Sequence, residues 1–260
     1  MEKSTVFRDG NTKKQVVLKG YDINKNITEW VIPAGITSIG RGAFRDCESL
    51  KSIIIPDSVT SIGRGAFRDC KSLKSIIIPD SVTSVGDYAF YGCESLESII
   101  IPDSVTSIGN AAFADCDLLR DIIMKGGVTS VENAAFMNCI SLKSIIIPED
   151  VTFIGNYAFY ACESLKSIII PGNVTSIGEC TFYACTSLEE IIIPQGITSI
   201  GKHAFADCTS LKSIIVPKSV TNIKNDTFIG CPDDIIIYVK ESSYVQEYAK
   251  QYDISFETIK

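Results

Sequence analysis

Phenylalanine recurs in this chain at a fixed interval of 23 residues, without one insertion or deletion. Leucine, isoleucine and cysteine keep the same interval, from Leu50 to Leu211, from Ile53 to Ile214 and from Cys47 to Cys231. A period of this length is typical of a solenoid, in which each coil contacts only its neighbours. We therefore expect a single elongated domain that presents a surface and encloses no reaction. The phenylalanines are Phe44, Phe67, Phe90, Phe113, Phe136, Phe159, Phe182, Phe205 and Phe228.

Composition narrows the possible functions. Hydrophobic residues make up 45% of the 260 residues, which is enough for a continuous core. The formal net charge of -7 argues against a nucleic-acid-binding protein, which needs a basic stripe to displace counterions from phosphates. No apolar run approaches the ~20 residues that cross a bilayer, so we expect no membrane insertion. The first residues lack the apolar core of a signal peptide, so the chain is either intracellular or a mature or excised part of a longer protein.

One repeat shows how a coil is built. Residues 51–55 are short, rich in isoleucine and followed by Pro56, which cannot donate to a β-ladder, and this pattern predicts a strand. Side chains alternate between the two faces of a strand. We therefore expect Ile53 and Ile55 to point into the core and Ile54 to point outward.

The rest of the repeat predicts the return path of the coil. A turn leads to a second short extended piece over residues 59–62. Gly63 then marks a corner, where we expect a backbone with positive φ. A single helical or 3-10 turn follows, and the Phe67 ring within it closes the core.

These residues resemble the BspA-like, or Treponema-type, leucine-rich repeats, whose pattern is L-x-x-I-x-I-P-x-x-V-x-x-I-G-x-x-A-F-x-x-C. The resemblance covers residues 24–231 in about nine repeats of 23 residues. It implies a right-handed repeat solenoid with a parallel β-sheet on the concave face and short extended or 3-10 segments on the convex face. Many family members look like secreted or cell-surface proteins linked to adhesion, and the family carries no catalytic motif. The fifth repeat departs from the pattern, with Lys125-Gly126-Gly127 after its strand and Glu132 at the corner position.

The two ends of the array need covers for its core. Residues 1–23 predict an N-terminal hairpin cap with a turn at Asp9-Gly10-Asn11. Residues 232–260 predict a C-terminal cap of strand, helix and strand, with Ser242 or Ser243 as the helix N-cap. From this closure we expect the chain to end with its array and to carry no attached anchor.

The ten cysteines predict no disulfide framework, because nine of them share one repeat position and stack in one column. Neighbouring strands lie ~4.8 Å apart with parallel Cβ directions, which does not suit the ~3.8 Å between Cβ atoms in a disulfide. Zinc needs ligands that converge from different directions. We expect buried, reduced thiols that act as small hydrophobic side chains. Cys180 lies outside the column, and we expect it near the surface as a free thiol.

Three polar features are weaker candidates for chemistry. His203 is the only histidine, and no serine or cysteine nucleophile motif accompanies it. A column of acidic residues follows the strands and suits either calcium or soluble turns. A basic cluster in the first two repeats suits either an anion or acidic partner, or a solvated face with salt bridges. The acidic column is Asp57, Asp80, Asp103 and Glu149, and the basic cluster is Arg41, Arg45, Arg64 and Arg68, with Asp46 and Asp69 interleaved.

The outward side chains of the strands are the best candidate site. They form an apolar stripe, begun by Val31, and soluble monomers rarely expose contiguous apolar patches above a few hundred Å². The alternative is that sequence repetition and β-propensity alone explain the isoleucines. A row of serines is expected to flank the stripe: Ser52, Ser75, Ser98, Ser144, Ser167 and Ser213. The predicted partner-binding residues are Ile54, Ile77, Ile100, Ile123, Ile146, Ile169, Ile192, Ile215 and Tyr238.

The sequence as a whole predicts a non-enzymatic protein-binding module without a cofactor or metal, part of an adhesin-like protein. Its expected partner is a protein ligand, either of the host matrix or of another cell surface. The expected location is extracellular or at the cell surface, with the cytoplasm as the alternative. A second interpretation is a structural protein that self-associates through the isoleucine stripe or a sheet edge.

Overall fold

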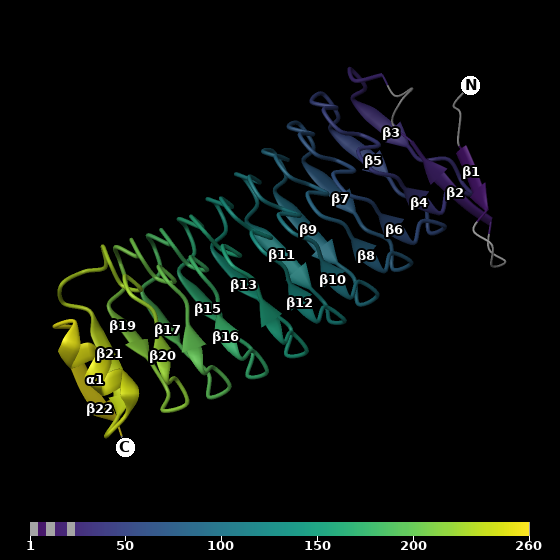
Figure 1. Ribbon diagram of the computed structural model, residues 1–260. Helices are drawn as coiled ribbons and strands as arrows, with labels where there is room; N and C mark the ends of the chain where they lie inside the picture. Colours follow the sequence, from purple (N-terminus) through teal and green to yellow (C-terminus); the bar gives the residue numbers. More distant parts are fainter. Residues whose placement is uncertain (1–4, 9–13, 20–23, 260) are drawn as a thin grey trace.

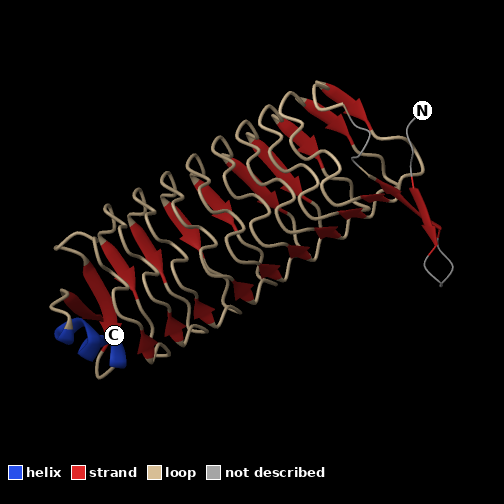
Figure 2. Cartoon of the chain, turned by 45° about the horizontal axis from the view of Figure 1, so that its top comes forward, coloured by secondary structure: helices blue, strands red, loops and turns tan. Residues whose placement is uncertain are grey.

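The computed structural model of the protein describes residues 5–8, 14–19 and 24–259. The chain winds as a solenoid of stacked coils that run along one axis (Figure 1). Strands form two parallel rows along this axis, and the helix lies at the C-terminal end (Figure 2). The repeat solenoid predicted from the sequence is therefore confirmed.

One row carries the isoleucine-rich strands, and we call it the isoleucine row. Residues paired between neighbouring coils are 23 positions apart, as Ile77 with Ile100 and Ile123 with Ile146. Hydrogen bonds divide the row into groups of two, five and four strands. Its strands are β3 (Glu29–Val31), β5 (Ser52–Ile54), β7 (Ser75–Ile77), β9 (Ser98–Ile101), β11 (Asp121–Met124), β13 (Ser144–Ile146), β15 (Ser167–Ile169), β17 (Glu190–Ile192), β19 (Ser213–Ile215), β21 (Ile236–Lys240) and β22 (Phe256–Ile259).

The second row consists of two-residue strands and begins with a hairpin. Strands β1 (Thr5–Arg8) and β2 (Lys14–Leu18) are antiparallel, and β2 continues into the row by parallel pairing with β4. The turn predicted at Asp9-Gly10-Asn11 lies outside the described residues. The remaining strands are β4 (Ser38–Ile39), β6 (Ser61–Ile62), β8 (Ser84–Val85), β10 (Ser107–Ile108), β12 (Ser130–Val131), β14 (Phe153–Ile154), β16 (Ser176–Ile177), β18 (Ser199–Ile200) and β20 (Asn222–Ile223).

A continuous column of phenylalanine rings fills the centre of the solenoid. Neighbouring rings are nearly parallel, with centroids 5.2 Å apart for Phe44 and Phe67 and 5.7 Å apart for Phe205 and Phe228. Trp30 meets the first ring edge-on at 6.1 Å, and Tyr248 meets the last one edge-on at 6.4 Å. Aromatic side chains thus close both ends of the column.

The inward strand positions pack around these rings as predicted. Ile53 and Ile55 are 6% and 7% exposed, and Val59 and Ile62 on the second extended piece are buried. No single coil could bury this apolar set, because its upper and lower surfaces face the neighbouring coils. Burial is therefore shared along the whole stack.

The positive φ predicted for Gly63 is wrong. This residue is not among the glycines with a left-handed backbone, and the reason for glycine is space. A Cβ at Gly63 would lie 2.8 Å from the carbonyl oxygen of Ile39 in the preceding coil, and one at Gly109 would lie 2.5 Å from the amide nitrogen of Asp87. Glycine therefore permits close stacking at this corner.

The fifth coil shows what happens without the corner glycine. The amide of Glu132 donates to the carbonyl of Ile108 at 3.3 Å, whereas the amide of Gly63 donates to Ile39 at 2.8 Å. The coil still pairs in register on both sides through β12. In this coil the side chain at the corner is thus accommodated with a longer contact between coils, whereas Lys224 at the corner of the last repeat donates to Ile200 at 3.0 Å.

Left-handed residues occur after the corner instead. Gly65 and Asp69 both have a φ of 58°, and Tyr88 and Cys180 are left-handed at the position of Gly65 in later coils. These residues interrupt helical geometry, so the segment consists of linked turns with hydrogen bonds between residues three apart, as from the Cys70 amide to the Phe67 carbonyl. Alternate amide groups donate to the next coil, as that of Phe67 does to the carbonyl of Ala89.

The helix α1 (Tyr244–Gln251) covers the C-terminal end of the core. The Ser243 hydroxyl accepts a hydrogen bond from the Gln246 amide at 3.2 Å, which is the usual N-cap arrangement. Val245, Tyr248 and Ala249 are its buried residues. After the helix, β22 pairs in parallel with β21 and ends the isoleucine row.

The corner glycines can be tested with a matched pair of substitutions. Gly109→Ala is expected to destabilise the protein by roughly 1–3 kcal/mol, because the new methyl group forces two coils apart. Gly172→Ala is the control, since a methyl group at Gly172 would meet no atom within 4 Å and the φ of this residue is ordinary. Chemical denaturation gives both free energies of unfolding, and an equal loss in the two variants would contradict the close-stacking role.

The phenylalanine column predicts that a substitution in a central coil destabilises that coil and its neighbours more than the coils at the two ends. Phe136→Ala should cost roughly 3–5 kcal/mol, the usual range for a fully buried phenylalanine. Because coupling runs between nearest neighbours, unfolding should also split into more than one transition. Calorimetry checks both effects, and a single transition at the wild-type temperature would contradict shared burial along the stack.

Candidate functional site

The outward residues of the isoleucine row form the most extended apolar surface of the described chain. Their exposed fraction ranges from 49% for Ile100 to 83% for Ile77, while Ile215 and Tyr238 near the C-terminal end are half-buried. Strand alternation explains their direction, since their neighbours on both sides point inward. We call this surface the isoleucine face, and it consists of Ile54, Ile77, Ile100, Ile123, Ile146, Ile169, Ile192, Ile215 and Tyr238, with Val31 in line before them.

The isoleucine face is continuous because the coils do not slip. Ile100 pairs with Ile77 on one side and with Ile123 on the other. At the usual strand spacing of ~4.8 Å, ten strands give an apolar band about 43 Å long. A contiguous exposed apolar surface rimmed by polar residues is the kind of feature that marks an interaction site.

Polar residues border the isoleucine face. The predicted serine flank is exposed at Ser52, Ser75, Ser98, Ser144 and Ser167 and half-buried at Ser213. Glu29, Asp121 and Glu190 occupy the same column in other coils and are exposed. An apolar centre with a polar border is the usual composition of protein interfaces.

A charged column next to the serines was missed by the sequence analysis. Arg120 and Glu97 lie 3.8 Å apart across neighbouring coils, and Lys212 donates to Glu189 at 2.8 Å. The hydrogen bond with Lys212 lowers the pKa of Glu189. Charges at the 23-residue interval, from Lys51 onward, were the signal that could have revealed this rim.

The acidic column and the histidine are not brought into a reactive arrangement. Asp57, Asp80 and Asp103 are exposed, and nowhere in residues 5–8, 14–19 and 24–259 do three acidic, cysteine or histidine side chains converge as a metal group. His203 Nε2 lies 3.7 Å from the carboxylate of Asp226. This pair forms an exposed ion pair when the histidine is protonated.

A ladder of amide and carboxyl side chains was also missed. The Asp87 carboxylate accepts from the backbone and side-chain amides of Asn110, and the Asn110 carbonyl oxygen accepts from Asn133. The Asn133 and Asn156 side chains then accept from the backbone amides of the following coils. Each side chain satisfies a group in the next coil, so this column stabilises the stack. Arg41 and Arg64 occupy the same column before it.

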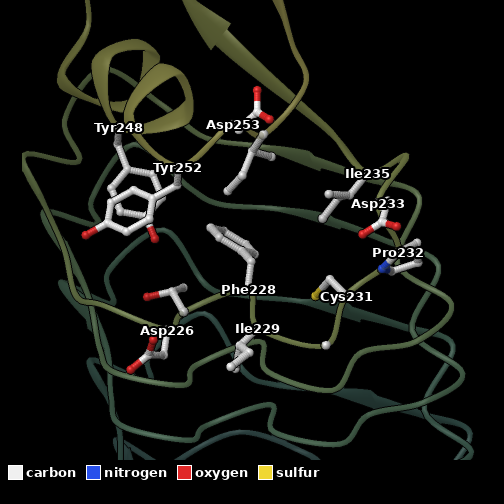
Figure 3. A pocket seen from close by; sticks show the side chains of 13 residues that line it. Asp226, Phe228, Ile229, Cys231, Pro232, Asp233, Ile235, Tyr248, Tyr252 and Asp253 are labelled. Carbon is white, nitrogen blue, oxygen red and sulfur yellow. The ribbon is translucent and has the colours of Figure 1, made fainter.

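A cavity of 460 Å³ opens between the last coil and the C-terminal helix (Figure 3). The end of the phenylalanine column, Phe228, points into it, and the rings of Tyr248 and Tyr252 stand together on one side with centroids 4.5 Å apart. Burial raises the pKa of Tyr248 to about 12. The sequence indicated the helix but not this cavity, which depends on how far the helix sits from the last ring. Asp226, Asp233 and Asp253 also line it.

The family model of the BspA type leucine rich repeat region matches residues 21–143 and 112–235 of the chain, in six copies. The chain belongs to the BspA-type leucine-rich repeat family. This confirms the resemblance found in the sequence. No curated protein sequence matches the chain.

Solved structures of leucine-rich repeat proteins resemble the array. A leucine-rich repeat protein of T. pallidum is 26% identical, with a TM-score of 0.57 over 80% of this chain and 87% of that one. One from Eubacterium ventriosum is 26% identical, with a TM-score of 0.54 over 89% and 74%. One from Bacteroides ovatus is 25% identical, with a TM-score of 0.50 over 100% and 99%. The likeness thus extends over most or all of each chain.

The cysteine column of this BspA-type array consists of reduced thiols. All ten cysteines are free, and each column thiol from Cys70 onward donates to a phenylalanine carbonyl 26 residues earlier, as Cys70 does to Phe44 at 3.1 Å. Burial raises the pKa of the Cys185 thiol to about 12 and that of the half-buried Cys231 to about 11. The thiols are thus protonated donors inside the core.

The prediction that Cys180 lies near the surface is wrong. Its exposed fraction is 6%, and burial raises the pKa of its thiol. The side chain of Tyr157, one coil earlier at the same repeat position, is in hydrogen-bonding contact with it. A large neighbour in the preceding coil therefore covers a position that is exposed or half-buried in most other coils.

These thiols predict a slow reaction in the folded protein. At pH 8 a thiol reagent should modify Cys231 first, because Cys231 is half-buried while the other nine cysteines are buried and out of reach of the reagent. Even at Cys231 the reaction should be slow, since a pKa of about 11 leaves about one thiolate in a thousand. In denaturant all ten should react quickly. Timed labelling with peptide mapping checks this order, and Cys231→Ala should remove the first product. Early modification of Cys180 would show that it is not covered.

Proposed function

We propose that this protein is a non-catalytic binding module that contacts a protein ligand through its isoleucine face. The observation that carries the proposal is the unbroken line of exposed isoleucines from Ile54 to Ile192. Water leaves an apolar band when a partner covers it, and the centre of such an interface supplies most of the binding energy. The serines and the charged column would form the solvent-accessible border.

The partner that we propose is a protein of a host matrix or of another cell surface, and the location is extracellular or at the cell surface. The likeness to BspA-like repeats supports both parts, since adhesion is a common role of that family. The net charge of -7 favours a protein over a nucleic acid as ligand. The alternative location is the cytoplasm. No helix among the described residues has the length and apolarity to cross a bilayer.

Each part of the chain has a separate role in this proposal. The solenoid of residues 24–231 would present the isoleucine face as far as Ile215, and Tyr238 would extend it into the C-terminal cap. The described parts of residues 1–23 and 232–260 would cover the two ends of the core. End covers keep a solenoid soluble, because an uncovered coil would expose the phenylalanine column. Catalysis and cofactors have no part in the proposal, in line with relatives that are leucine-rich repeat proteins.

A second candidate is self-association through the same surface. Two copies of a regularly spaced apolar band can pack against each other without any unique pocket, because every coil offers the same side chain. In the described chain, β22 is also the last strand of its sheet and has a free edge. Edges of this kind pair with other strands unless they are blocked.

The central isoleucines provide the test. Replacing Ile100, Ile123 and Ile146 together by Thr keeps strand propensity and leaves the core intact, so the free energy of unfolding should change by less than about 1 kcal/mol. Affinity for a partner should fall at least about tenfold, because the apolar contact is removed at the centre of the face. The wild-type protein is used to capture ligands from matrix and cell-surface extracts, and these ligands are identified. Surface plasmon resonance then measures the affinity of each ligand for the wild type and for the triple variant.

The inward neighbours are the matched control. Ile99, Ile122 and Ile145 are 2–6% exposed, and their replacement by Thr should cost roughly 2 kcal/mol or more each, since it buries hydroxyl groups without partners. A mass that rises with concentration in the wild type and not in the outward variant supports self-association. Unchanged affinity and unchanged mass in the outward variant would rule out the isoleucine face as the binding surface.

A further inference from the structure

Two consecutive coils carry the same seven residues, at 41–47 and at 64–70. Because the coils stack in register, the repeated sequence forms two stacked pairs of arginines and one stacked pair of glycines. These residues line a depression of 240 Å³. The pairs are Arg41 with Arg64 and Arg45 with Arg68, and the glycines are Gly42 and Gly65.

The glycines open the depression. Their backbone is left-handed, with φ of 60° at Gly42 and 58° at Gly65, and later coils hold a side chain in the same conformation at this position. Tyr88 is the first of these, and its ring stands at the end of the depression. These two coils are thus the ones in succession that lack a side chain at this left-handed position.

Ion pairs within the protein leave part of the positive charge unneutralised. Arg68 Nε lies 3.1 Å from the carboxylate of Asp69, and Arg45 Nε lies 3.6 Å from that of Asp46. Neither Arg41 nor Arg64 has a carboxylate partner within the described part of the chain. Positive charge thus accumulates in one place on a chain with a net charge of -7.

Aromatic rings hold two of the guanidinium groups in place. The guanidinium carbon of Arg64 lies 5.2 Å from the ring centroid of Tyr88, and that of Arg68 lies 4.7 Å from the ring centroid of Tyr91. A guanidinium stacked on a ring keeps the N–H groups at its edge free to donate. The side chain of Lys25 adds a further cation, since its ammonium donates to the carbonyl of Arg45.

We propose that this depression binds a tetrahedral oxyanion, the phosphate or sulfate group of a ligand. Guanidinium groups donate paired, charge-assisted hydrogen bonds to phosphate-like oxygens. Here four arginines line one depression, which suits an anion with oxygens in several directions better than a planar carboxylate. The site uses other segments of the coil than the isoleucine face, so it does not depend on the function proposed above.

The test titrates the full chain with inorganic phosphate and with inorganic sulfate by calorimetry, at constant ionic strength set with sodium chloride. The double variant Arg41→Asn with Arg64→Asn uses the residue that Asn110 and Asn133 supply in the same column. Saturable binding by the wild type should weaken at least about tenfold in this variant, since charge-assisted hydrogen bonds are lost. Arg120→Gln with Lys212→Gln removes the same charge elsewhere and should leave the affinity unchanged.

A second variant separates the shape of the depression from its charge. Gly65→Tyr places a ring in the depression and keeps every arginine. Tyr88 and Tyr157 show that the left-handed position accepts this side chain. It should also weaken binding at least about tenfold. A melting temperature close to that of the wild type in each variant shows that the stack is intact.

Methyl phosphate and methyl sulfate distinguish the source of the group. A phosphate monoester takes up its second proton near pH 6, so its affinity should fall between about pH 7.5 and about pH 5, whereas that of a sulfate ester should not. Preference for either ester supports the site and names its ligand chemistry. The proposal is overturned if neither inorganic anion binds saturably, if the arginine double variant binds as the wild type does, or if acetate binds as tightly as phosphate.

Discussion

Hydrogen bonding between equivalent residues of successive coils is the constraint on which the rest of the structure depends. The strands pair with an offset of 23 residues, and the turns after the corner bond to the next coil as well, as from the Phe67 amide to the carbonyl of Ala89. With this offset fixed, every side chain meets its own counterpart above and below. The stacked phenylalanine rings, the hydrogen bonds of the buried thiols and the line of exposed isoleucines all follow from this register between coils.

Much of this architecture could be predicted from the sequence, because residues that recur every 23 positions stack directly on one another in the structure. Phe44 to Phe228 had to form one column once the period was recognised, and so did the buried thiols. The corner glycine was assigned the wrong cause, since close approach between coils and positive φ both favour glycine, and composition does not separate them. Gly65, two positions later, is the residue with the left-handed backbone. Cys180 was misplaced because its environment comes from Tyr157, a residue of another coil.

The candidate surfaces also include features that the sequence predicted and features that only the packing of the coils determines. Alternation along a strand was enough to send Ile100 outward, and the serine border followed from it. The arginine cluster was visible in the sequence, but the depression that it lines also depends on Gly42 and Gly65, which carry no side chain there. The cavity beside Phe228 lies where the period ends, and there the packing of a single helix on a single ring decides the geometry. Periodic reasoning is therefore strongest in the interior of the array and weakest at its last coil.

The repeated seven residues at 41–47 and 64–70 bear on how such a chain can change over generations. A duplication of one repeat's worth of codons inserts one more coil without disturbing the coils on either side, since each contacts only its neighbours. The face grows longer by one strand, and any pair of side chains on the duplicated segment becomes a stacked pair. New binding chemistry can thus arise from copying alone, before any codon is substituted. In this chain, two coils with the same seven residues turn two single arginines into two stacked pairs that line one depression.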